Sequence, residues 1–168
     1  MSVKQEHAEI RPLTIAQLPL YADVIRHSFI TVAEDFGLTM DNCPNFKSFI
    51  TDERLAEKFT GLYFPFGYYA KGELIGFASL TYLQDGVYEM NDVSVLPGLR
   101  HRGAGTRLLE FCKEKVKEFG GNKITIGIIE DHTVLKDWYA ANGFVHTGVK
   151  RFDHLPFTVG FMEWELDT

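Results

Sequence analysis

One segment constrains the fold of this chain more than any other. Residues 93–106, VSVLPGLRHRGAGT, run from a β-branched strand pattern through a glycine-rich turn into a helical pattern. Gly103 and Gly105 keep the backbone free of side chains where that helix begins. Helix N-termini attract anions through their free N–H groups and their dipole, and Arg100 and Arg102 add positive charge. The segment therefore predicts a phosphate-binding turn between a strand and a helix.

Two common phosphate-binding motifs fit this turn poorly. A P-loop has the pattern GxxxxGK[ST], and Gly98 and Gly103 have its glycine spacing, but Ala104 stands where the lysine belongs. The dinucleotide-binding pattern GxGxxG fails because Leu108 stands in place of the third glycine. A nucleotide-binding protein stays an alternative, and it predicts that the chain binds ATP or NAD.

Hydrophobic periodicity predicts a mixed arrangement of strands and helices along the rest of the chain. Strands are expected over residues 9–13, 68–70, 74–83, 87–96, 124–129, 144–149 and 158–166. Helices are expected over residues 14–36, 45–59, 103–119 and 132–142, the first opened by a capping box of Thr14 and Gln17. The aromatic run at residues 62–69 is expected to serve packing. This order predicts one α/β (α+β) domain over residues 1–168, with its core at about 9–166.

Charge and cysteine content exclude several classes of protein. The net charge of −6 argues against nucleic acid as a partner, because phosphate binders are usually basic. Residues 99–123 alone carry seven basic and three acidic side chains, a local +4 that suits a small anionic ligand. Two cysteines form neither a disulfide framework nor a zinc-ligand spacing, so no metal is expected. No long apolar segment occurs, so we expect a cytoplasmic protein without a membrane partner.

The pattern R-x-x-G-x-G at Arg100–Gly105 resembles the pyrophosphate loop of the GNAT superfamily of N-acetyltransferases. A second segment, WYAANGF at residues 138–144, is similar to the Y-x-x-x-G-F segment of that family. The element order is similar over nearly the whole chain, and the specific motifs cover about residues 87–106 and 132–144. The resemblance implies a GNAT fold, a mixed and mostly antiparallel central sheet with helices on both faces.

The same resemblance implies that the co-substrate is acetyl-CoA. Its pyrophosphate would bind backbone N–H groups of the glycine turn, which comprises His101, Arg102, Gly103, Ala104, Gly105 and Thr106. Its pantetheine arm would pair with the strand segment Val93-Ser94-Val95, where one N–H would polarise the thioester carbonyl. The family often has an asparagine seven residues before its tyrosine, and here His132 takes that place. Histidine also donates or accepts hydrogen bonds, so we expect it to contact the same arm.

Two side chains are candidates for proton transfer. Glu89 lies six residues before Val95, the spacing of the catalytic glutamate in the histone-acetylating branch of the family, and is the predicted general base. Strand alternation would place Glu89 on one face with Asn91, Val93 and Val95 unless a bulge intervenes, with Asp92, the second choice, on the other. Tyr139 corresponds to the family tyrosine that protonates the departing thiolate.

The sequence thus predicts an N-acetyltransferase that transfers acetyl directly from acetyl-CoA to a primary amine in a ternary complex. A second hypothesis is a GNAT scaffold that binds acyl-CoA as a sensor or partner module without turnover. The amine, of a small molecule or a protein, stays unidentified. In the family, the segment between the first two helices borders the acceptor site, and here residues 31–45 carry Glu34, Asp35 and Asp41, which suit a cationic acceptor. Many relatives dimerise, so a homodimer is also considered.

Overall fold

Seven strands form one continuous sheet that runs through the whole molecule. The structure, a computed structural model, describes residues 8–167. The strands are β1 (Ala8–Pro12), β2 (Tyr63–Ala70), β3 (Glu73–Gln84), β4 (Val87–Val95), β5 (Lys123–Ile129), β6 (Val145–Arg151) and β7 (Thr158–Glu165). Their order is β1-β2-β3-β4-β5-β7-β6, and every neighbouring pair is antiparallel except β4 and β5. The predicted mixed, mostly antiparallel sheet is confirmed.

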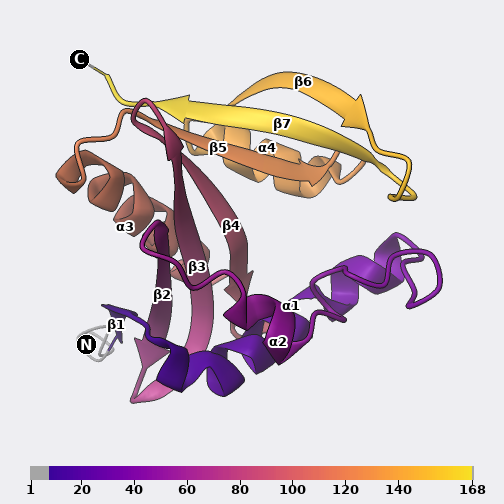
Figure 1. Cartoon of the computed structure of the whole chain (residues 1–168), viewed down its shortest axis with the longest axis horizontal. Coiled ribbons are helices and arrows are strands. Elements are labelled where there is room, and N and C mark those ends of the chain that lie inside the picture. The colour runs from indigo at the N-terminus through magenta and orange to yellow at the C-terminus, as the bar shows by residue number, and fades with distance from the viewer. Residues whose placement is uncertain (1–7, 168) are drawn as a thin grey trace.

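Four α-helices cover the two faces of this sheet. They are α1 (Leu18–Asp35), α2 (Asp52–Ala56), α3 (Ala104–Glu118) and α4 (Thr133–Ala141), with short 3-10 helices η2 (Ile15–Gln17) and η3 (Pro97–Leu99). Helices α1 and α2 pack on one face, named the α1 face, and α3 and α4 pack on the other, named the α3 face (Figure 1). Among residues 8–167, none of the helices has both the length and the apolarity that a membrane crossing requires.

Each face has its own hydrophobic cluster. Leu108, Leu109 and Cys112 of α3 are fully buried on the α3 face, against Ile124 and other apolar residues of the sheet. Tyr21 and Ile25 of α1, together with Leu55 of α2, pack against Phe77 on the α1 face. The ring of Tyr21 stacks on that of Phe77 at 4.6 Å. These clusters hold β3 and β4 rigidly between two helical layers.

The expected helix over residues 45–59 is wrong in its first half. Residues 45–49 form turns, and the helix is only the five residues of α2. Thr51 is extended and caps α2 through the N–H of Arg54. Arg26 of α1 donates 2.9 Å hydrogen bonds to the Ile50 carbonyl and the Asp52 carboxylate, and so holds the chain in this break. A tertiary contact therefore overrides a helical pattern.

The aromatic run that was expected only to pack forms most of a strand. Strand β2 begins at Tyr63, five residues before the predicted start. Pro65 has no N–H to donate to a neighbouring strand. Residue-by-residue pairing of β2 with β1 begins at the next residue, Phe66. The Pro65 carbonyl accepts a 2.9 Å hydrogen bond from the N–H of Leu13, the residue after β1, so the proline keeps a backbone contact on this side.

Candidate active site

The sheet opens between its two parallel strands. Strands β4 and β5 pair only from Val87 with Lys123 to Glu89 with Thr125. Beyond these pairs the strands separate toward their carboxyl ends, as Figure 1 shows. In the described part of the chain, no strand therefore covers the β5-facing edge of β4 after Glu89. Such an edge presents backbone groups that an extended ligand can pair with, as an added strand would.

A β-bulge in β4 lies at this opening. Phe77 of β3 pairs with Ser94 and Ser79 pairs with Asn91, so two residues of β4 oppose one residue of β3. The bulge residue Asp92 has a φ of 59°, in the left-handed region that aspartate tolerates better than most residues. The insertion reverses which face each following side chain occupies.

This bulge corrects the predicted faces of β4. Glu89 and Asn91 pair with Thr81 and Ser79, which are in phase with Phe77 and therefore lie on the α1 face. Val93 and Val95 pack instead with the cluster of the α3 face. The expectation that Glu89 shares a face with both valines fails, because it holds only for a strand without a bulge.

The glycine turn that was predicted to bind phosphate lies at the start of α3, named the anion cradle. Gly103 has a φ of 86° and precedes the helix, and no side chain caps this terminus among the described residues. The N–H groups of Ala104, Gly105 and Thr106 are in the first turn and have no acceptor within the helix. His101, Arg102, Gly103 and Thr106 are exposed. These features fit a diphosphate, because an anion would supply the missing cap.

Arg100 lies away from this cradle. Its guanidinium donates to the Val95 carbonyl at 3.1 Å, to the Thr31 hydroxyl at 3.1 Å and to the Ser28 carbonyl. Burial lowers the pKa of Arg100 from its ordinary value. The side chain therefore joins the end of β4 to the middle of α1, whereas Arg102 is exposed in the glycine turn.

Helix α4 brings Tyr139 to the α3 face. The side chain is 5% exposed, packs edge-on against Trp138 and Phe144, and belongs to the same cluster as Cys112. Burial raises the pKa of its phenol, and the nearby Cys112 adds to this effect. The phenol therefore stays protonated at neutral pH, the form that a proton donor needs. Trp138 lies over the start of α3, 3.4 Å from the place of a Cβ on Gly105.

His132 precedes α4 at the end of the opening. Its ring lies 5.3 Å from that of Phe36, just after α1. Burial lowers the pKa of His132, although the charge of Asp35 acts in the opposite direction. A neutral imidazole at this place can accept as well as donate a hydrogen bond. The structure thus puts His132 beside the segment expected to border the acceptor.

Glu89 is partly buried on the α1 face. The Asn91 side-chain amide donates a 2.8 Å hydrogen bond to its Oε1 and fixes the carboxylate along the strand. On β5, Thr125 pairs with Glu89, and Gly127 lies two residues further along the same face and is exposed. Gly127 was missed in the sequence, although a glycine inside an apolar strand signals a close approach to the backbone. A Cβ at Gly127 would meet Val159 Cγ1 of β7 at 3.3 Å.

Asp92 also lies on the α1 face, which overturns its predicted orientation. Its carboxylate is 3% exposed and contacts Lys47 Nζ at 3.0 Å and Lys58 Nζ at 3.2 Å. Burial by itself would raise the pKa of Asp92, but the two lysines outweigh burial, and the pKa lies below its ordinary value. A carboxylate held in its charged form by two cations is a weak base. Lys47 and Lys58 were not predicted.

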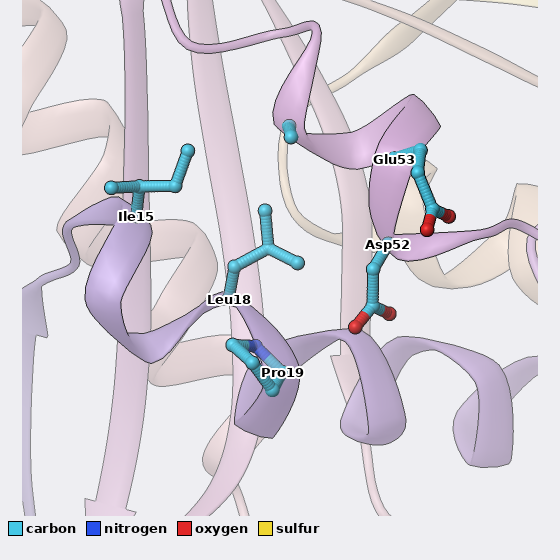
Figure 2. A pocket seen from close by; sticks show the side chains of 6 residues that line it. Ile15, Leu18, Pro19, Asp52 and Glu53 are labelled. Carbon is cyan, nitrogen blue, oxygen red and sulfur yellow. The ribbon is translucent and has the colours of Figure 1, made fainter.

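A shallow pocket between the start of α1 and α2 is separate from this site. Figure 2 shows Ile15, Leu18 and Pro19 on one side and Asp52 and Glu53 on the other. Those five side chains include none of the residues around the β4–β5 opening. Within residues 8–167, no three His, Cys, Asp or Glu side chains come together as a metal site requires.

Comparisons with known proteins agree with this geometry. The model of the acetyltransferase (GNAT) family matches residues 32–144. An uncharacterized N-acetyltransferase in the pepI 3' region of Lactobacillus delbrueckii subsp. lactis is 26% identical over 156 residues, covering 85% of this chain and 84% of the relative.

Two solved structures show the same fold at low sequence identity. The ribosomal-protein-S18-alanine N-acetyltransferase of Escherichia coli superposes with a TM-score of 0.78 at 14% identity, covering 96% of this chain and 95% of the other. The PaiA N-acetyltransferase of Thermoplasma acidophilum, solved in complex with coenzyme A, has a TM-score of 0.69 at 22% identity. The match covers 94% of this chain and 98% of the other.

Proposed function

Because this chain belongs to the acetyltransferase (GNAT) family, we propose that it transfers acetyl from acetyl-CoA directly to a primary amine. The observation that carries the proposal is the uncapped start of α3 beside the free edge of β4. The start of α3 would bind a diphosphate, and the edge of β4 would bind an extended amide chain. These are the two parts of coenzyme A between its nucleoside and its thioester.

The chain's own groups would hold the co-substrate along this path. Backbone N–H groups from His101 to Thr106 would bind the pyrophosphate, and the backbone of Val93 and Val95 would pair with the pantetheine arm. A protein with the same fold was solved in complex with coenzyme A, which supports coenzyme A as the ligand class. Bound acetyl-CoA supplies an activated acetyl thioester. An N–H of β4 beside its carbonyl would favour the charge that develops there by a few kcal/mol.

Glu89 and Tyr139 lie on opposite faces of the sheet opening. Lysine-like amines have a pKa of about 10.4, so forming the free base at pH 7 costs about 4.6 kcal/mol. Glu89 would accept that proton on the α1 face. Tyr139 would give a proton to the sulfur on the α3 face. The amine would enter on the α1 face and the thiolate would leave on the α3 face, and this arrangement supports direct transfer in a ternary complex.

Calorimetric titration of the purified protein with acetyl-CoA tests the first half of this proposal, with ATP and NAD as controls. We expect micromolar binding of acetyl-CoA alone. Release of coenzyme A thiol is then measured with a panel of spermidine, tyramine and alanine amide. Binding without amine-dependent release under any condition would favour a sensor on the same scaffold. Binding of ATP or NAD in place of acetyl-CoA would overturn the assignment of the glycine turn.

A further inference from the structure

A buried charged cluster joins the β4 bulge to the segment between α1 and β2. Lys47 lies in the turns before α2, and Lys58 lies two residues after it. Both ammonium groups reach the carboxylate of Asp92, one at each oxygen, at 3.0 and 3.2 Å. The carboxylate is almost fully buried, whereas the lysine side chains are 31% and 36% exposed. The cluster therefore has a buried carboxylate at its centre and two lysine side chains that reach the surface.

We propose that Asp92 is a positioning residue for the acceptor: its carboxylate clamps residues 45–58 against the β4 bulge beside Glu89. This inference rests on the proposed acetyl transfer. The Asp92 carboxylate contacts Lys47 and Lys58, and it acts on the acceptor through these two side chains. Residues 45–58 continue from residues 31–45, the segment expected to border the acceptor, and are named the acceptor wall; the clamp would set the distance between this wall and the edge of β4.

The lysines hold this wall from two sides of α2. The Lys47 ammonium also lies 5.1 Å from the centre of the Phe29 ring of α1, and Phe29 meets Phe46 edge to face. Aromatic and carboxylate contacts together leave Lys47 little freedom. Residues 45–58 are also held to α1 by the Arg26 contacts with Ile50 and Asp52, and Leu55 packs in the cluster that contains Phe77 of β3. Asp92 adds two ion pairs that attach the segment to β4.

The same residue also shapes the edge that binds the thioester. The left-handed backbone of Asp92 forms the bulge, and the Ser94 hydroxyl donates a 2.6 Å hydrogen bond to its carbonyl. The bulge sends Val93 and Val95 to the α3 face while the side chain of Asp92 turns to the α1 face. One residue therefore links the geometry of the thioester edge with the position of the acceptor wall.

Asp92→Asn separates these two contributions, because asparagine also tolerates the left-handed backbone and only the charge is lost. We expect the KM for the most reactive amine of the panel to rise at least tenfold. The acetyl-CoA Kd should stay within twofold, and kcat should fall less than threefold. Amide hydrogen exchange should accelerate in residues 45–58 and stay unchanged in residues 101–106.

Lys58→Gln is the second variant, and it serves if Asp92→Asn fails to fold. Lys58 is partly exposed and Lys47 still pairs with Asp92, so we expect the same pattern with a smaller rise in KM. Lys117→Gln, which removes a surface ion pair with Glu114 on α3, is the matched control and should change none of these values.

If amide hydrogen exchange in residues 45–58 is unchanged in Asp92→Asn, the clamp is overturned. If exchange is faster but the KM for the amine is unchanged, Asp92 has only a structural role and the proposal is overturned. Either result with an active wild type leaves the proposed function standing. A wild-type protein that binds no acetyl-CoA would instead overturn the proposed function and this inference with it.

Discussion

The Arg100 guanidinium donates a 3.1 Å hydrogen bond to the Thr31 hydroxyl, across 69 positions of sequence, and so ties the glycine turn to helix α1. The same side chain donates to the carbonyls of Ser28 and Val95. The residue that opens the R-x-x-G-x-G pattern is therefore used to join two parts of the fold.

Arg100→Met should lower the free energy of unfolding by about 2–3 kcal/mol, because it leaves partly buried acceptors without a charged donor. Arg102→Met is the matched variant, because Arg102 is exposed. Its unfolding free energy should change by less than about 0.5 kcal/mol, while its acetyl-CoA Kd rises. Urea unfolding and calorimetric titration measure the two effects. Equal losses of stability in both variants would contradict the assignment.

Gly105→Ala should weaken acetyl-CoA binding without harming the fold. A Cβ at Gly105 would lie 3.4 Å from the Trp138 ring, an ordinary contact distance, and the glycine is within a helix. Alanine stabilises helices by up to about 1 kcal/mol relative to glycine, so the melting temperature should hold or rise. The added methyl group would lie at the start of α3, where the pyrophosphate is proposed to bind. Gly98→Ala is the control, since nothing lies near its Cβ position; a loss of affinity there as large as in Gly105→Ala would refute the prediction.

Tyr139→Phe should lower kcat by about a hundredfold, the usual contribution of a positioned proton donor. A phenylalanine ring would keep the edge-on contacts with Trp138 and Phe144, so stability and acetyl-CoA affinity should hardly change. Coenzyme A release measures the rate. Tyr82→Phe, which alters a ring packed on Tyr88, should behave as wild type. If Tyr139→Phe is equally fast, the phenol is not the acid.

Glu89→Gln should lower kcat by about 10²- to 10⁴-fold near neutral pH and move the rising limb of the pH–rate profile to higher pH. Without the carboxylate, turnover depends on amine that is already deprotonated. Initial rates across pH 6–10 with a saturating amine test this expectation. Glu73→Gln, at an exposed β3 terminus, should keep the wild-type profile. A pH–rate profile that Glu89→Gln leaves unchanged would remove Glu89 as the base.

Asp92 should stabilise the fold at neutral pH and lose this effect in acid. Its pKa in the folded protein is below the ordinary value, since Lys47 and Lys58 outweigh burial. The groups facing it are these two lysines and the phenols of Tyr21 and Tyr63. Its contribution is therefore complete above the unfolded pKa of about 3.9 and disappears as pH falls through the folded pKa.

Urea unfolding at pH 7, 5, 4 and 3 measures this contribution as the difference between wild type and Asp92→Asn. We expect a constant difference from pH 7 to 5 and a smaller one at each lower pH. The other carboxylates titrate in both proteins, so their effects cancel in the difference. A difference that grows in acid would show that the folded pKa of Asp92 is raised.

Local patterns in the chain were enough to place most elements and the glycine turn before α3. Thr14 and Gln17 form the predicted capping box at the start of η2. Gly103 lies just before α3 at positive φ, as the glycine turn indicated. Such features depend on residues within a few positions of one another, and their propensities can be read directly. The fold of the family followed from their order.

The partners of the site residues could not be read in this way. The bulge at Asp92 depends on its pairing with β3, and it reversed the predicted faces of Asp92 and of Val93 and Val95 relative to Glu89. The contacts of Arg100 with Ser28 and of Lys58 with Asp92 join residues 72 and 34 positions apart. Periodicity carries no information about such distant pairs. The chemistry of each residue can thus be predicted from its local sequence. The face of the sheet that it occupies and the group that it contacts are decided only when distant segments pack together.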